Sequence, residues 1–528
     1  MEGMKILVKD DIAEKAVEIL KKDFDVDVLT KISQEEFIDI IGKYDALLIR
    51  SATTVTADVI EKADRLKIIG RAGIGVDNVD VNAANKKGII VANAPQSNII
   101  SAAEQALALM FALCRRTPDA WVSLKSGKWE RSKFKGIEIY GKILGIIGFG
   151  RIGALVAQRA IGLGMKVMAY DPFVADDRFS NLGVERANSL DTIYKQADII
   201  SIHLPKNKDT YHLLDEKAFS KMKKGVLIIN TARGTIIDEK ALATALESGQ
   251  VGGAGIDVYE VEPCTDSPLF SLPNVVCTPH LGASTVEAQD KAGIQIAEQV
   301  KAALLGQGVS TAVNIPQVSQ ESMEELKPFM PLGENLGKLF ISLFPGNLNN
   351  FDVEYYGNIA GHDTRLLTTI ILKGVLEKIE ESVNMVNAPF LAKERGIEVR
   401  ELKSSESKDY ISLIVLKGKY GTKEFSVSGT LMGKNNQQKF VSIDGFELDL
   451  VPTEFMAFFK YEDVPGVIGT IGTILGKQKI NIANMQVSRT EKGGVALNGI
   501  NVDQFISREV LEEIRVNANI KEAVFIKL

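Results

Sequence analysis

The feature that most constrains the fold is a glycine-rich turn directly after a short apolar run. Residues 143–147, Ile-Leu-Gly-Ile-Ile, lead into Gly148-Phe-Gly-Arg-Ile-Gly153. In this G-x-G-x-x-G pattern, Gly148 provides a tight turn, Gly150 lets a pyrophosphate approach the backbone, and Gly153 lets a helix pack closely on the strand. The phosphates then lie at the start of that helix, where free N–H groups favour negative charge. The pattern predicts a dinucleotide-binding unit.

An acidic residue further along indicates which dinucleotide binds. A second apolar run, residues 166–170, ends at Asp171, eighteen residues after Gly153. A carboxylate at this point in the fold reaches the 2′-hydroxyl of a ribose. It would repel the additional 2′-phosphate of NADP. The sequence therefore predicts NAD as the cofactor.

The length and the charge of the chain exclude several classes of protein. With 528 residues the chain is too long for one core, and its net charge of −6 is spread over mixed signs, which argues against nucleic acid or a membrane surface as a partner. We find no apolar run near the ~20 residues that span a bilayer and no signal segment. The three cysteines lack the spacing of a disulfide framework or a metal site. We expect a soluble cytoplasmic protein without a metal.

The apolar runs divide the chain into units. Short β-branched runs alternate with helical stretches from residue 5 to about residue 93, and again from residue 143 to residue 277, which predicts two doubly wound parallel sheets of the Rossmann type. Beyond residue 316 the alternation stops and an α+β unit is expected. The order of runs from residue 454 to residue 528 is βαββαβ, a ferredoxin-like pattern that can pair edge to edge with a second copy.

Three polar residues follow the ends of predicted strands in the second series. His280 lies in Thr-Pro-His-Leu-Gly, and a histidine suits the acceptance of a hydroxyl proton near neutral pH. Glu262 can hold the imidazole and stabilise its charged form. Arg233 can bind a carboxylate through two parallel hydrogen bonds. His203 also ends a strand and is expected to line the cofactor pocket.

These segments together resemble the D-isomer-specific 2-hydroxyacid dehydrogenase family. The resemblance covers the whole chain and depends on the dinucleotide turn and on four further motifs. These are Arg71-Ala-Gly-Ile-Gly-Val-Asp-Asn78, Asn230-Thr-Ala-Arg-Gly234, Glu260-Val-Glu-Pro263 and Pro279-His-Leu-Gly-Ala-Ser-Thr285.

The resemblance implies four domains and a catalytic trio. The implied domains are a substrate-binding domain (residues 1–97 and 283–316), an NAD-binding domain (98–282), an intervening α+β domain (317–451) and a regulatory ACT domain (452–528). His280 would be the acid/base, Glu262 its partner and Arg233 the carboxylate anchor. The residues expected to contact NAD are Ile74, Gly148, Gly150, Arg151, Ile152, Gly153, Asp171, His203, Pro205, Thr210, Thr231, Ala232, Asp257, Leu281, Gly282 and Ala283.

The substrate implied by the resemblance carries a phosphate. The long members of the family oxidise D-3-phosphoglycerate to 3-phosphooxypyruvate, the first committed step of L-serine biosynthesis. Substrate contacts are expected at Arg50, Ser51, Arg71, Gly73 and Asn98. Arg131, with Lys133, is a further candidate for the phosphate because arginine matches phosphate oxygens, although a solvated basic loop is an equal alternative.

The last domain implies regulation. Tyr461, Asp463 and Asn481 occupy the positions where ACT domains bind a serine effector across a two-fold interface. Other members have histidine and asparagine where Tyr461 and Asp463 stand. The alternative is a module that only assembles subunits. In either case a homo-oligomer, a tetramer, is expected.

Two other functions stay open from the sequence. One is an NAD-dependent dehydrogenase or reductase for another 2-hydroxy acid, such as 2-hydroxyglutarate or glyoxylate. The other is a regulator that senses NAD without turnover. An appended serine-sensing domain favours an enzyme over a regulator, because feedback control is useful only where metabolic flux passes.

Overall fold

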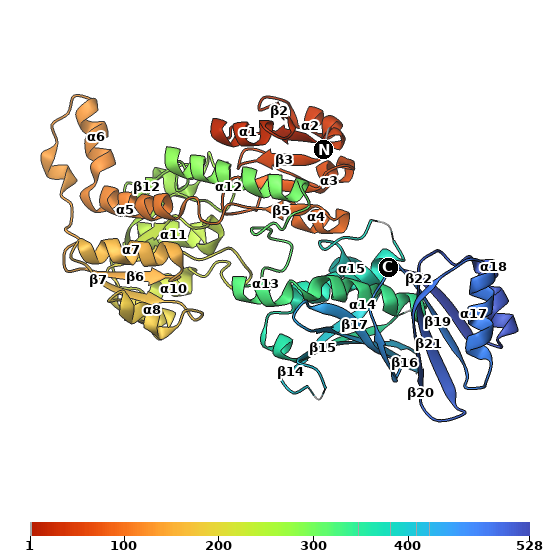
Figure 1. The fold of residues 1–528 in the computed structure, drawn as a ribbon. Coiled ribbons are helices and arrows are strands. Elements are labelled where there is room, and N and C mark those ends of the chain that lie inside the picture. The colour runs from red at the N-terminus through yellow and green to blue at the C-terminus, as the bar shows by residue number, and fades with distance from the viewer. Residues whose placement is uncertain (1–2, 347, 381, 408, 422) are drawn as a thin grey trace.

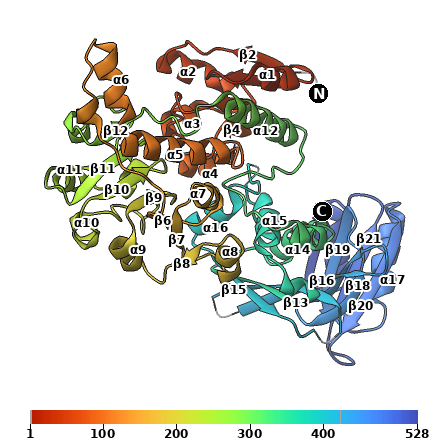
Figure 2. The same cartoon turned by 90° about the vertical axis from the view of Figure 1, so that its left-hand side faces the viewer.

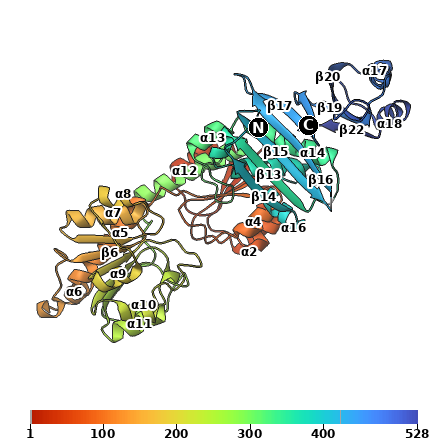
Figure 3. The ribbon, with the colours of Figure 1, turned by 90° about the horizontal axis from the view of Figure 1, so that it is seen from below.

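The chain forms four sheets that follow one another along an extended molecule. The structure is a computed structural model that describes residues 3–346, 348–380, 382–407, 409–421 and 423–528. Figures 1 and 3 show the second sheet at one end, the first beside it, then the third, with the fourth at the opposite end. We name the four domains by the order of their sheets in the chain.

The first domain is a parallel five-stranded sheet in the order β2-β1-β3-β4-β5. Its inner strands β1, β3 and β4 are mainly buried apolar runs because helices cover both faces, whereas the edge strand β2 alternates aspartate with valine. The elements are β1 Lys5–Val8, α1 Glu14–Lys21, β2 Asp25–Val28, α2 Gln34–Ile40, η1 Ile41–Lys43, β3 Ala46–Ile49, α3 Ala57–Lys62, β4 Ile68–Arg71, α4 Val81–Lys87, β5 Ile90–Ala92 and the later helix α12 Val286–Leu304.

After the second domain, the chain returns to the first domain in helix α12. Thr285 caps its first turn by accepting from the Ala288 N–H. The helix then packs against α1 and β4, and Figure 2 shows it beside the N-terminal elements. A Cβ at Gly70 would lie 2.8 Å from both Ile296 and Val300, so β4 needs glycine there. The chain therefore crosses between the first two domains twice.

The second domain is a parallel seven-stranded sheet in the order β12-β11-β10-β9-β6-β7-β8. Strand β6, which lies between β9 and β7 in this sheet, precedes the glycine turn. The elements are α5 Ile99–Arg115, α6 Thr117–Lys125, η2 Arg131–Phe134, β6 Ile143–Ile147, α7 Arg151–Gly162, β7 Lys166–Tyr170, α8 Asp176–Asn181, β8 Glu185–Arg186, α9 Leu190–Gln196, β9 Ile199–Ile202, α10 Glu216–Lys221, β10 Val226–Asn230, η3 Gly234–Ile236, α11 Glu239–Glu247, β11 Val251–Ile256, η4 Pro268–Ser271 and β12 Val275–Cys277.

The third domain is a mixed six-stranded sheet in the order β14-β13-β15-β16-β17-β18. Helices α14 and α15 pack tightly on each other beside it. The elements are α13 Gln320–Leu326, α14 Phe329–Leu343, β13 Asn350–Gly357, η5 Asn358–Gly361, α15 Arg365–Glu377, α16 Ala388–Glu394, β14 Glu398–Ser404, β15 Ser412–Tyr420, β16 Lys423–Met432, β17 Gln437–Ile443 and β18 Phe446–Leu450.

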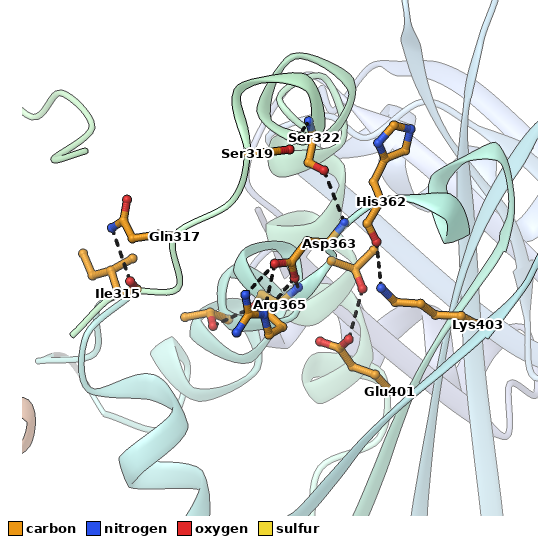
Figure 4. Close-up of polar contacts among 11 residues, drawn as sticks. Ile315, Gln317, Ser319, Ser322, His362, Asp363, Arg365, Glu401 and Lys403 are labelled. Carbon is orange, nitrogen blue, oxygen red and sulfur yellow. Dashed lines mark hydrogen bonds and ion pairs between the residues drawn. The ribbon is translucent and has the colours of Figure 1, made fainter. Parts of the chain in front are cut away.

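Polar contacts join α13 to the turn that precedes α15 in the third domain (Figure 4). Ser319 caps α13, and the Ser322 hydroxyl accepts from the Asp363 N–H at 3.4 Å. In the turn before α15, the Lys403 ammonium donates to the His362 carbonyl at 2.7 Å. Arg365, the first residue of α15, is paired with Asp363.

The fourth domain is an antiparallel four-stranded sheet in the order β20-β21-β19-β22 with two helices on one face. Its other face joins the core of the third domain through Met456, Phe458, Leu497 and Ile526. The elements are β19 Phe455–Glu462, α17 Val467–Lys477, β20 Ile482–Arg489, β21 Val495–Val502, α18 Arg508–Asn517 and β22 Glu522–Lys527. The predicted βαββαβ order is confirmed.

The first and third domains meet through a small polar contact. The Asn384 amide donates to the Gly88 carbonyl at the end of α4, at 2.9 Å, and Lys86 lies over the ring of Phe390 in α16. Cavities of about 440 and 700 Å³ lie at this contact. A contact of this kind is weaker than the shared apolar core of the third and fourth domains.

The predicted fold class is confirmed: two parallel Rossmann-like sheets, an α+β domain and a ferredoxin-like domain. Within the part of the chain that the structure describes, every helix is too short or too polar to cross a membrane.

We predict opposite effects for two helical glycines. A Cβ at Gly337 of α14 would lie 2.9 Å from the Val375 nitrogen of α15 and would overlap the Ile371 carbonyl, whereas a Cβ at Gly472 of α17 meets no atom within 4 Å. Gly337→Ala should therefore cost about 1–3 kcal/mol by overpacking, and Gly472→Ala should gain up to about 1 kcal/mol from helix propensity. Thermal unfolding midpoints compare the two variants. Equal shifts of the same sign would contradict the packing argument.

Candidate active site

The glycine turn has the geometry that its three glycines predict. Gly148 has φ +94°, and a Cβ there would lie 2.6 Å from the His203 carbonyl oxygen. A Cβ at Gly153 would overlap the Gly148 carbonyl, whereas Gly150 has no atom within 4 Å of that direction. Gly150 is also the N-cap of α7, and no side chain caps that helix. The start of α7 is thus open to a phosphate group.

Asp171 lies at the end of β7, beside this turn. Its carboxylate accepts from the Phe149 N–H at 2.9 Å and from the Phe173 N–H at 3.0 Å. These bonds fix the carboxylate next to the glycine turn, as binding of a ribose hydroxyl requires. The residues fit an adenine dinucleotide.

His203 closes the far side of the turn as a neutral side chain. Burial lowers its pKa to about 4, and its Nε2 atom shares a hydrogen bond of 2.8 Å with the Ser201 hydroxyl. The next loop is shaped by Thr210, whose hydroxyl donates to the Pro205 carbonyl at 2.7 Å. His203 and Pro205 therefore provide an uncharged wall beside Gly148.

The remaining predicted NAD contacts follow strand ends. Arg151 and Ile152 are the first two residues of α7, and Ile74 follows β4 in the first domain, where its carbonyl accepts from the Asn93 amide at 2.6 Å. Thr231 and Ala232 follow β10, and Leu281, Gly282 and Ala283 follow β12. Ligands of doubly wound sheets lie at these carboxyl ends.

His280 and Glu262 are in direct contact. Their Nδ1 and Oε2 atoms are 2.6 Å apart. Burial alone would raise the pKa of Glu262, but hydrogen bonds from His280 and from the Tyr259 N–H, together with the charge of Arg233, lower it below its ordinary value. The carboxylate is therefore ionised at neutral pH and can stabilise a protonated imidazole.

The His280 loop is held by one buried carboxylate, that of Asp257. This side chain is fully buried. It accepts from the N–H groups of Leu281 at 2.7 Å and Gly282 at 2.8 Å and from the Thr278 hydroxyl at 2.5 Å, and the His280 N–H donates to the Asp257 backbone carbonyl at 2.8 Å. Asp257 thus fixes the loop that carries His280, while its predicted contact with NAD stays a prediction.

Arg233 follows β10 and faces the first domain. Its Nη1 donates to the Ala232 carbonyl at 2.7 Å, and its Nε lies 3.3 Å from a carboxylate oxygen of Asp77. A Cβ at Gly234 would overlap the Tyr259 carbonyl group. This close packing brings the Arg233 turn against the turn that carries Glu262.

Arg71 is the second cation at this junction. Its side chain lies directly over Gly73, where a Cβ would overlap its Nη1 atom. Burial, and then the charge of Arg233, lower its pKa to about 10. Arg50 lies in the same surroundings, with its Nη1 donating to the Asp11 carbonyl at 3.1 Å. The three arginines create a strong demand for an anion.

Some buried polar atoms without a partner belong to predicted ligand-binding residues. Among the described residues, nine buried side-chain atoms have no hydrogen-bond partner. Three of them belong to predicted site residues: Arg71 Nε, Asn98 Oδ1 and Thr231 Oγ1. Because buried polar atoms are nearly always paired, these three indicate a place that a ligand completes.

Two predicted substrate residues are not brought to these arginines by a described contact. Ser51 is exposed after β3. Arg131 lies in η2, which packs on α6 of the second domain. Arg131 therefore stays a prediction for the phosphate.

The three predicted effector residues are separated within one chain. Tyr461 is only 2 % exposed and belongs to the core between the sheet and its helices, so within one chain its side chain is almost closed to an effector. Asp463 follows β19 and pairs with Arg489 at 2.7 Å, whereas Asn481 precedes β20 and donates to Asp503 at 2.7 Å. In the sheet, Arg489 pairs with Ala496 and Ile482 with Val502. Asp463 and Asn481 thus lie at opposite ends of the sheet.

Asp77 was not predicted as a site residue. Its signal in the sequence is its place in the motif Arg71-Ala-Gly-Ile-Gly-Val-Asp-Asn78, which carries the resemblance to the family. That position does not show that its partner is Arg233 of another domain. Only the docking of the two domains reveals this contact.

Three segments of the chain match models of known domain families. Residues 107–282 match the model of the D-isomer specific 2-hydroxyacid dehydrogenase NAD binding domain. Residues 325–444 match the D-3-phosphoglycerate dehydrogenase intervening domain, and residues 455–519 match the ACT domain. The second domain is therefore an NAD-binding domain.

Several relatives match nearly the whole chain. Proteins named D-3-phosphoglycerate dehydrogenase from Methanocaldococcus jannaschii and Bacillus subtilis are 44% and 40% identical, covering 99% of this chain and 100% and 99% of theirs.

Among solved structures, TT0316 from Thermus thermophilus (32% identity, TM-score 0.55) and apo D-lactate dehydrogenase from Escherichia coli (29%, 0.53) each cover 59% of this chain and 100% of their own. The chain therefore belongs to the D-isomer specific 2-hydroxyacid dehydrogenase family, in the group whose full-length members are named D-3-phosphoglycerate dehydrogenase.

Proposed function

We propose that the chain oxidises D-3-phosphoglycerate to 3-phosphooxypyruvate with NAD⁺. The observation that carries this proposal is the His280–Glu262 pair beside Arg233, at a junction that also holds the half-buried Arg71. A hydroxy acid that carries a phosphate supplies negative charge to balance the positive charge of these arginines. The names of the full-length relatives support the same substrate.

The residues divide the work of binding. Arg233 anchors the carboxylate, because a guanidinium can donate two parallel hydrogen bonds to it. Arg71 and Arg50 attract the phosphate, and the unpaired Asn98 amide oxygen is available to a hydroxyl donor. Glycines 148, 150 and 153 with Asp171 hold the dinucleotide. Bound NAD⁺ supplies the acceptor for the hydride.

The proton follows a separate route. The hydroxyl of the substrate gives its proton to the free Nε2 of His280, because Nδ1 faces Glu262. Glu262 stabilises the positive charge that develops on the ring. Asp257 keeps the imidazole in place by fixing the loop. In the reverse direction His280 returns the proton to the carbonyl oxygen.

His280→Gln should reduce kcat for D-3-phosphoglycerate by about 10²- to 10⁴-fold, the usual contribution of a general base. Steady-state NADH formation measures the loss, and fluorescence titration should show unchanged NADH binding. His362→Gln, in the third domain, is the matched control and should keep full activity. Retained turnover in His280→Gln would remove the assigned role.

Arg233→Lys should raise KM for the substrate at least about ten-fold, because a lost hydrogen bond to a charged group costs about 1.5–3 kcal/mol. A lysine keeps the charge but cannot form the two-pronged contact. Initial rates over a range of substrate concentrations give the change. A KM equal to that of the unchanged protein would contradict the anchor.

A panel of acids separates the proposed substrate from related ones. D-3-phosphoglycerate is compared with 2-hydroxyglutarate and, in the reverse direction, with glyoxylate. The positive charge of the half-buried Arg71 favours the phosphorylated acid. A regulator that only senses NAD would turn over none of them.

We propose that the enzyme is a cytoplasmic homo-oligomer, a tetramer. Helix α6 projects from the second domain (Figure 1), and it carries the exposed apolar residues Trp121, Val122 and Leu124. Trp129, just beyond it, is 83% exposed. Apolar patches of this kind favour contact with another subunit, and the fourth domain offers a second contact through its sheet edge. The unpaired cysteines fit a reducing compartment.

We propose that L-serine regulates the enzyme through the fourth domain. Asp463 and Asn481 lie at opposite ends of one sheet, and a strand of eight residues spans about 25 Å. A two-fold related copy can place the Asp463 end of one domain beside the Asn481 end of the other. The effector would then bind between subunits.

L-Serine should lower the initial rate of the unchanged enzyme, and Asn481→Ala should weaken this inhibition, because the amide that would bind the effector is lost. The ratio of rates with and without L-serine measures the effect in both proteins. D-Serine serves as the control ligand. Equal inhibition of both proteins would place the effector elsewhere.

A further inference from the structure

Asp77 contacts the carboxylate anchor from the opposite domain. It lies in the loop between β4 and α4, and its carboxylate is 3.3 Å from Arg233 Nε. A Cβ at Gly75 would lie 2.5 Å from Arg233 Nη2 and 2.7 Å from the same Asp77 oxygen. The two charged groups therefore meet directly over Gly75.

The contact occupies the side of Arg233 that a substrate carboxylate needs. Nη1 already donates to the Ala232 carbonyl at 2.7 Å. Nε and Nη2 are left as the pair of donors that can bind a carboxylate with two parallel hydrogen bonds. Both of these atoms face Asp77 and Gly75.

The backbone beside Asp77 is fixed, but its side chain is not. The Asn78 amide donates to the carbonyls of Arg50 at 2.7 Å and Thr53 at 2.6 Å, and Asp80 caps α4. Among the described residues, by contrast, the carboxylate of Asp77 has only the ion pair with Arg233, and it is 55% exposed. It can leave Arg233 by rotating into solvent.

A further acid near these arginines, Asp10, cannot do the same. Asp10 accepts from the backbone N–H groups of Arg50 at 2.6 Å and Thr53 at 3.2 Å, and also from the Thr53 hydroxyl. It is buried and fully engaged within the first domain.

We propose that Asp77 is a built-in substitute for the substrate carboxylate. It pairs with Arg233 before the substrate binds, and the incoming carboxylate displaces it. Asp77 thereby keeps the anchor turned toward the junction, and it lowers the affinity for every carboxylate by competing for the same donors. The inference relies on the proposed role of Arg233 but not on the identity of the rest of the substrate.

Asp77→Asn tests the proposal, because it keeps the shape of the side chain and removes its charge. Partly exposed ion pairs are weak, so the expected fall in KM for D-3-phosphoglycerate is about two- to five-fold, with kcat not increased. The difference between the two proteins should shrink at high salt, because an exposed pair is screened. Asp39→Asn, an exposed acid of the same domain, controls for the change in net charge.

A binding measurement makes the result independent of turnover. Calorimetry with oxamate, an unreactive 2-oxo acid analogue without a phosphate, in the presence of NADH should give a Kd that falls by the same factor in Asp77→Asn. Asp77→Glu should keep the weaker affinity of the unchanged enzyme. If phosphoglycerate is not turned over but oxamate binds more tightly to Asp77→Asn, the proposed function fails and this inference stands.

Two outcomes would overturn the inference. A higher KM with a lower kcat in Asp77→Asn would mean that Asp77 orients Arg233 for the substrate rather than competing with it. An unchanged Kd for oxamate and an unchanged KM would mean that the ion pair has no part in carboxylate binding.

Discussion

The buried carboxylate of Asp257 is the constraint on which the active site depends. Removing a charge from water is costly, and the cost is offset here because the carboxylate oxygens accept several hydrogen bonds from the loop after β12. The same bonds fix the backbone on both sides of His280. The His280 side chain can then meet Glu262 at 2.6 Å without further support from its own loop.

Much of this arrangement was predictable from local sequence. The glycine turn depends on the lack of a Cβ at Gly148 and Gly153, and that requirement is visible in the residues themselves. Two features were not predictable: the hydrogen bonds by which Asp257 holds the His280 loop, and the Asp77–Arg233 pair. Each of them joins segments that are separated in the chain. Burial of Tyr461 was missed for a related reason: a tyrosine at a strand end fits the core and the surface equally well.

The packing of the fourth sheet has a consequence for regulation. The face that its two helices leave uncovered packs on the third domain, because Met456, Phe458 and Leu497 belong to the core of that domain. The two domains therefore behave mechanically as one body. A ligand that joins two copies of the fourth domain must also reposition the two third domains relative to each other.

The contact between the third and first domains is smaller than the core that the third and fourth domains share. The third domain reaches the first through the Asn384 amide and the Gly88 carbonyl, beside two cavities that polar and apolar residues line together. Gly88 ends α4, and the loop that precedes α4 carries Asp77 and follows Arg71, the last residue of β4. Because α4 is a short helix of seven residues, a shift of its C-terminal end also moves its N-terminal end. The contact of Asn384 thus lies at the far end of the helix that follows the Asp77 loop.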